Sequence, residues 1–159
     1  MSVPLTLFHA VQGAASAYAG LLSAIAIYNL QQREDQAEHA AQYSNTAGHL
    51  LHKTRMTQTS GALATISSII SSIVLAVTSS SEGQGGSLFP ILLSTANTVG
   101  LGLAYRHIRN FWLPRAKVPF LSDYNDGVTA SKNLQQALGA LSITWAASSL
   151  VHLWFFMGA

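Results

Sequence analysis

The residues best suited to chemistry begin with a short run of imidazole and basic side chains. His49, His52 and Arg55 follow one another at intervals of three residues, and we expect them to share one face if the stretch is helical. A histidine can move a proton near neutral pH, and a guanidinium can stabilise negative charge on a bound molecule. This run therefore predicts one half of a candidate acid–base site.

A second polar group predicts the other half. Lys132, Asn133 and Gln136 stand where a long apolar stretch begins, and Asn133 and Gln136 are three residues apart on one helical face. With Arg55 or Lys132 supplying positive charge, the two groups could line a pocket for an anionic or phenolic substrate. Asn97 lies inside another apolar stretch, where a polar side chain tends to face a bundle or cavity. Alternatively, all these groups are only anchors at a membrane surface.

The composition argues against several other kinds of site. The chain has no cysteine, which excludes disulfides, thiolate nucleophiles and Cys-ligated metals. His49 and His52 have no convincing third ligand, and His9 and His152 form a weaker candidate pair at the other end of the apolar stretches. A formal net charge of +2 does not by itself indicate nucleic acid. We predict no metal, no cofactor and no nucleic-acid partner.

The elements that would position these residues are membrane-spanning helices. Only 9% of the residues are charged and 49% are hydrophobic, whereas a soluble domain carries about a quarter charged residues. Crossing a bilayer takes roughly 20 apolar residues. The apolar stretches predict four spans, at about 4–30, 56–80, 87–108 and 130–157, with residues 122–127 as a loop. The predicted fold is a single all-α domain, an integral membrane four-helix antiparallel bundle.

The distribution of positive charge predicts the orientation of this bundle. All eight Lys and Arg residues lie in or beside the two longer loops, and cytosolic loops are the ones enriched in Lys and Arg. We therefore place loops 31–55 and 109–130 in the cytosol and both termini in the lumen or outside, in the endoplasmic reticulum or a related endomembrane. Small residues along the spans suit close helix packing, within the bundle or against a second copy or a membrane partner.

Three local stretches carry a resemblance to a known family. They are residues 19–27 (AGLLSAIAI) in the first span, Gly48-His49 leading into the second, and residues 133–138 (NLQQAL) at the start of the fourth. Together with chain length and span order, they resemble the fungal anthrone oxygenases, small four-span proteins built on a domain of unknown function. The family's Pro-Thr-Asn after the third span is absent, and Gln135 or Gln136 replaces its arginine.

The resemblance implies a cofactor-free oxygenase of polyketide metabolism that oxidises an aromatic anthrone to an anthraquinone. His49 would be the base, with His52 as a substitute, and Asn133 would orient the substrate oxygen. Arg55 or Lys132 would stabilise the enolate. The partners would then be an apolar small molecule and the lipid bilayer. A cyclisation or isomerisation of an apolar metabolite fits the same residues.

Two other functions remain open from the sequence. In length and number of spans the chain also resembles the MAPEG superfamily of glutathione-dependent membrane transferases. This resemblance implies that Arg55, Gln58 and Arg106 would contact glutathione. The chain could instead be a non-enzymatic accessory subunit. A cavity lined by His49, His52 and Asn133 would favour an enzyme, whereas a solid bundle with these groups in solvent would favour a subunit.

Overall fold

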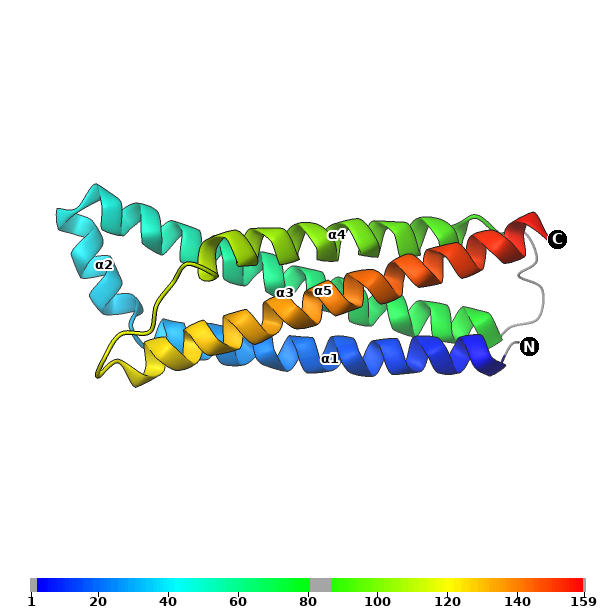
Figure 1. Ribbon diagram of the computed structural model, residues 1–159, viewed down its shortest axis with the longest axis horizontal. Helices are drawn as coiled ribbons and strands as arrows, with labels where there is room; N and C mark the ends of the chain where they lie inside the picture. The colour runs from blue at the N-terminus through cyan, green and yellow to red at the C-terminus, as the bar shows by residue number, and fades with distance from the viewer. Residues whose placement is uncertain (1–2, 81–86, 159) are drawn as a thin grey trace.

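The computed structural model describes residues 3–80 and 87–158, and this part of the chain is entirely helical, without a strand. It forms four long helices and one short one, whose arrangement can be followed in Figure 1. Their bounds are α1 Val3–Gln31, α2 Glu34–Tyr43, α3 Asn45–Ser80, α4 Phe89–Trp112 and α5 Ser122–Met157. The all-helical prediction is thereby confirmed for the described residues.

The four long helices lie side by side as an antiparallel bundle. Around the bundle the order is α1, α3, α4, α5, because α1 packs on α3 and α5 while α4 packs on the same two helices from the other side. Figure 1 shows that both termini lie at one end, here named the terminal end. At the opposite end, named the basic end, α1 finishes, α5 begins and the short α2 rests against α3.

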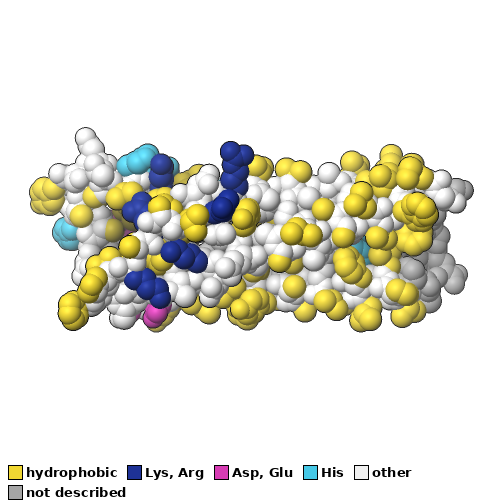
Figure 2. Space-filling model, viewed as in Figure 1, with side chains coloured by type: hydrophobic (Ala, Val, Ile, Leu, Met, Phe, Trp, Pro, Cys, Tyr) yellow, Lys and Arg dark blue, Asp and Glu magenta, His cyan; other side chains and the backbone are white. Residues whose placement is uncertain are grey.

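Three of the helices are long and apolar enough to cross a membrane: α1, residues Asn45–Ser79 of α3, and α5. The fourth, α4, has 24 residues but carries Asn97, Arg106 and Arg109, which lower its mean hydropathy. Large apolar side chains point outward along all four, including Leu63, Leu92 and Ile143. On the face shown in Figure 2, Lys and Arg gather toward the basic end, and hydrophobic side chains dominate toward the terminal end.

The interior of the bundle is more polar than its surface. Buried polar side chains are at least as numerous as buried hydrophobic ones. Several of them link helices: Ser16 and Ser68 lie 2.7 Å apart between α1 and α3, and Ser94 and Ser148 lie 3.1 Å apart between α4 and α5. Hydroxyl and amide bonds between helices, together with small residues, suit a bundle whose outer surface is covered by lipid.

Two helices extend well beyond the predicted spans. α3 starts at Asn45 rather than near residue 56, and α5 starts at Ser122 rather than near residue 130. The expectation of a loop at 122–127 is therefore wrong. Gly127 marks a close packing contact instead of a turn, since a Cβ there would lie 2.6 Å from Cγ of Leu30. The true loop precedes it and is braced by Asn125, whose side chain bonds both backbone groups of Val118 at 2.8 Å.

Candidate functional site

The run His49, His52 and Arg55 is helical, which was the condition for a shared face, but its members do not face the same way. Each step of three residues falls about 60° short of a full helical turn, so the run sweeps about 120° around α3. Arg55 consequently faces α2, where it makes ion pairs with Glu34 and Glu38. His49 and His52 turn toward solvent and are exposed.

The second predicted group is likewise spread out. Asn133 and Gln136 are exposed on the outer face of α5. Lys132 is half-buried, and its Nζ donates a 3.0 Å hydrogen bond to the carbonyl oxygen of Arg115. Asn97 is buried in the middle of α4, where its Nδ2 donates to the Ser71 hydroxyl at 2.8 Å. Of these residues and the run on α3, only Arg55 lines the cavity of the basic end that is described next.

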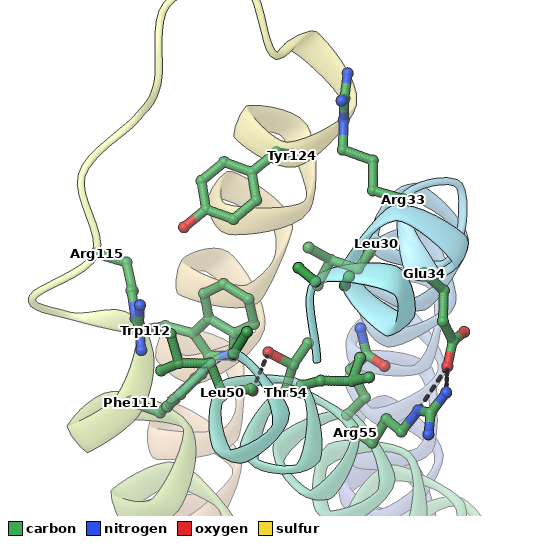
Figure 3. Close-up of a pocket in the computed structure, with 15 residues that line it drawn as sticks. Leu30, Arg33, Glu34, Leu50, Thr54, Arg55, Phe111, Trp112, Arg115 and Tyr124 are labelled. Atoms are coloured by element: carbon green, nitrogen blue, oxygen red, sulfur yellow. Dashed lines mark hydrogen bonds and ion pairs between the residues drawn. The ribbon is translucent and has the colours of Figure 1, made fainter. Parts of the chain in front are cut away.

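This cavity, the basic-end pocket, is lined by residues near the ends of all five helices (Figure 3). Its volume is about 360 Å³, within the range of small-molecule sites. α1 contributes Leu30, α2 and α3 contribute alanines and leucines, α4 contributes Phe111 and Trp112, and α5 contributes Tyr124. The walls are therefore mainly aliphatic and aromatic. Such a space suits an apolar body the size of a small ring system or a short acyl chain.

Positive charge surrounds these apolar walls. Arg33 and Arg115 line the pocket together with Arg55. Arg55 is neutralised by Glu34 and Glu38, and Arg33 by Asp123 at 3.5 Å. The Arg115 guanidinium lies 4.5 Å from the centre of the Phe111 ring and makes no ion pair with any carboxylate in residues 3–80 and 87–158. It is the cation left available to a ligand.

Two buried donors of the pocket lack a partner. Nε of Arg33 and Nε2 of Gln58 are both buried without a hydrogen bond in the described part of the chain, and both residues line the pocket. Leaving a buried donor unpaired costs about 1–3 kcal/mol. Both orphaned atoms are N–H groups, so the missing partner is an acceptor. With Arg115, they favour a ligand with an apolar body and an acceptor-rich, negatively charged group.

A shallower hollow adjoins this pocket and contains His49. It is lined by His49, Lys53, Asn110 and Pro114, and it shares Leu50, Phe111 and Arg115 with the basic-end pocket. A ligand seated over Phe111 and Arg115 would therefore extend toward the His49 imidazole. His52 and Asn133 do not line either of these two hollows. The structure thus joins His49 to the pocket through shared walls while leaving His52 and Asn133 outside it.

The terminal end contains a second polar cluster, entirely inside the bundle. His9 from α1 and His152 from α5 are buried, and their Nε2 atoms lie 3.2 Å apart. Gln12 joins them by a 3.1 Å contact with Nδ1 of His9 and a 3.3 Å hydrogen bond to the Thr144 hydroxyl. The pair singled out as the weaker candidate is thus brought into direct contact.

Sequence reasoning missed most residues of the basic-end pocket. The charge pattern identifies Arg33 and Arg115 only as positive charge in loops, and it assigns no site role to Phe111, Trp112 or Tyr124. A usable signal was present in residues 111–115 (FWLPR), where adjacent aromatics precede an arginine at the end of an apolar stretch. This is a common composition for an amphipathic binding surface.

Comparison with protein-family models, with curated proteins and with solved structures gave no match to this chain. Within residues 3–80 and 87–158, no group of three or more His, Asp or Glu side chains is placed to hold a metal ion. The function is therefore inferred from the geometry of the basic-end pocket and of the His9–His152 cluster.

Proposed function

We propose that the chain is a four-span membrane protein with the basic end in the cytosol and both termini in the lumen of an endomembrane. The apolar outer surface and the three membrane-length helices support insertion. α4 qualifies as the fourth span because it is enclosed between α3 and α5 and its 24 residues extend about 36 Å. The eight Lys and Arg residues all fall at or near the basic end, which supports the cytosolic assignment.

Its proposed role is to bind an apolar small molecule bearing a negatively charged group in the basic-end pocket. The observation that carries this proposal is that the pocket is lined by two residues with unpartnered buried donors, Arg33 and Gln58, and by Arg115, which makes no ion pair in the described residues. The aromatic walls would hold the apolar body, and the Arg115 guanidinium beside Phe111 would bind the anion. The pocket lies at the level where α1 and α4 end, so a membrane-dissolved ligand would reach it with its charged group toward water.

A binding experiment on the chain in lipid nanodiscs tests this role. The probe is anthracene-9-carboxylate, compared with the uncharged anthracene-9-carboxamide, and empty nanodiscs supply the partition background. We expect the carboxylate to bind at least about tenfold more tightly than the amide, because a charge-assisted bond contributes about 1.5–3 kcal/mol. Equal affinity for the two probes, or no binding above the empty nanodiscs, would contradict the proposal.

A second candidate function is oxidation of such a ligand, favoured by the walls that His49 shares with the pocket. In this reaction His49 would remove a proton from the methylene carbon of an anthrone, and Arg115 would stabilise the enolate. Molecular oxygen would then oxidise that carbon to a ketone, one oxygen atom entering the product and the other leaving as water. The chain would be a tailoring enzyme of polyketide-type metabolism.

Membranes containing the chain, incubated under air with emodin anthrone, test the enzyme. Oxidation faster than in empty membranes, lost in His49→Ala and retained in His52→Ala, would support this assignment. Binding of the carboxylate without any excess oxidation would instead favour another tailoring reaction or an accessory subunit that holds a ligand for a partner enzyme.

A further inference from the structure

The His9–His152 contact at the terminal end has a geometry specific to two imidazoles that share a hydrogen. The two ring planes differ by only 3°, and the ring centres lie 5.4 Å apart. The Nε2 atoms are 3.2 Å apart. If each Nε2 lies on the line between the two ring centres, the centre-to-centre distance equals this value plus the distance from centre to nitrogen in each ring, as is found here. The rings therefore meet edge to edge, with the Nε2 atoms aimed at one another, and do not lie face over face.

The surrounding hydrogen bonds fix which nitrogen carries the hydrogen. The Thr144 hydroxyl donates to the carbonyl oxygen of Leu141 at 2.9 Å, so it accepts the bond from Nε2 of Gln12. Oε1 of Gln12 is then left facing Nδ1 of His9, and a carbonyl oxygen can only accept. Nδ1 of His9 must be the protonated nitrogen, and its Nε2 presents a lone pair. Nε2 of His152 consequently donates the hydrogen between the rings.

No other charged side chain approaches this pair from the described residues. Asp, Glu, Lys and Arg are absent from α1 and from residues 56–80, 87–105 and 133–158. Gln12 and the rings of Phe8 and Trp145 contact His9, and Thr144 lies beyond Gln12. Glu82 and the two chain termini lie outside the described residues. Among the described residues, therefore, the only charge that acts on either imidazole of the pair is the charge of the other imidazole.

We propose that His9 and His152 form a proton-binding site that accepts one proton without losing its hydrogen bond and is opened by a second. The first proton binds Nδ1 of His152, whose Nε2–H then becomes a charge-assisted and stronger donor to His9. The second can bind only Nε2 of His9, which would set N–H against N–H and place two positive charges on facing rings. The bond is lost at that point, and the terminal ends of α1 and α5 separate.

This site is independent of ligand binding at the basic end and adds a response to acidity. In the proposed orientation the terminal end faces the lumen, so the pair would respond to acidification of that compartment. α1 and α5 would remain closed there through the first protonation and open only in a more acidic lumen. The two-step behaviour distinguishes the pair from ordinary surface histidines, which titrate singly.

Pulsed electron paramagnetic resonance can follow the opening directly, since the native chain has no cysteine. Spin labels on Ala10→Cys and Leu150→Cys, both at exposed positions beside the pair, report the separation of α1 and α5 in nanodiscs. We expect one short distance at neutral pH and a shift to a longer distance on strong acidification, when the second proton binds. His9→Gln/His152→Gln cannot titrate and should keep one distance throughout.

An unchanged distance in the native pair at every pH, or the same shift in the double glutamine variant, would overturn the proposal. If the double variant fails to fold, ¹⁵N spectra of the histidine rings of the unmodified pair decide the matter. Two separated protonation steps for His9 and His152 support the site. Single, independent protonation steps for these two histidines would refute it.

Discussion

The indole nitrogen of Trp145 donates a 2.8 Å hydrogen bond to the hydroxyl of Ser68, which lies 77 residues earlier in the chain. Ser68 in turn lies 2.7 Å from the Ser16 hydroxyl, and Ser16 donates to the carbonyl oxygen of Gln12 at 2.8 Å. Because an indole can only donate and Ser16 uses its own hydrogen on Gln12, Ser68 must donate to Ser16. One continuous chain of hydrogen bonds therefore crosses α5, α3 and α1.

Removing the Ser68 hydroxyl from the centre of this hydrogen-bond series should destabilise the bundle. In Ser68→Ala, the Trp145 N–H stays buried without an acceptor, and we expect a loss of about 1–3 kcal/mol in the free energy of unfolding. Reversible unfolding in mixed micelles of increasing dodecyl sulfate measures it. Ser67→Ala, at the exposed neighbouring position, is the matched control and should change little. Equal stability of the two variants would show that the bond contributes nothing.

The closeness of α3 to α4 and α5 predicts a contrast between two glycines. A Cβ at Gly61 would lie 2.9 Å from Cδ2 of Leu134 and 3.2 Å from Cδ1 of Ile108, whereas nothing lies within 4 Å of a Cβ at Gly100. We expect Gly61→Ala to cost about 1–3 kcal/mol through overpacking. Gly100→Ala should be neutral or stabilising by up to about 1 kcal/mol. The same micelle titration measures both, and the reverse order would contradict the packing described.

Arg115 should carry most of the preference of the basic-end pocket for a charged ligand. Arg115→Gln removes the cation without an ion-pair partner, and we expect anthracene-9-carboxylate to bind about ten- to a hundredfold more weakly, with the carboxamide little affected. Arg109→Gln removes an equal charge from an exposed position of α4 that does not line the pocket. If both variants weaken binding equally, the attraction is only the general charge of the basic end.

The ion pairs of Arg55 should hold α2 over the pocket. α2 has no buried residue, and Arg55 bonds both Glu34 and Glu38 on it. In Arg55→Gln we expect faster amide hydrogen exchange across residues 34–43, with exchange in α1 and α5 unchanged. High salt should have a similar effect on the native chain because exposed ion pairs are screened. Lys53→Gln is the charge-matched control, and slow exchange of α2 in Arg55→Gln would refute the role.

The proposed orientation can be tested by glycosylation. An acceptor site fused after Ala159 should be glycosylated in microsomes, because the C-terminus is assigned to the lumen. The same site inserted after Phe120, in the exposed loop of the basic end, should remain unmodified. Modification at the second site alone would invert the topology, and modification at both would exclude a single four-span arrangement.

The helices were predictable because hydropathy and length are local properties of the chain. The apolar stretches 4–30, 56–80 and 130–157 each fall within one of the three membrane-length helices. The extensions at Asn45 and Ser122 were not predicted, since polar residues there continue a helix that no longer needs an apolar surface. Gly127 looked like a turn residue because sequence alone does not show the Leu30 side chain packed against it.

The candidate site was less predictable because it depends on the rotation of each helix. The run from His49 to Arg55 has intervals of three residues, which predicts a shared face. The rotation of the helix over two such intervals directs His49 and Arg55 to different sides of α3. Arg115 lies in the loop between α4 and α5 and Tyr124 in the first turn of α5, and only the packed ends of the helices bring them to the pocket with Leu30. The His9–His152 contact joins residues 143 apart, and only the antiparallel order of α1 and α5 suggests it.

The buried hydroxyls have a consequence for how the chain is made. Many of them donate to a carbonyl of their own helix, as Ser72 does to Ser68, Ser79 to Leu75 and Thr98 to Ser94. A helix that satisfies its hydroxyl hydrogens internally can leave the translocon alone, without carrying unpaired donors into lipid. The oxygen lone pairs stay available and meet a neighbouring helix only when it arrives. Insertion and assembly can thus proceed as separate events during biogenesis.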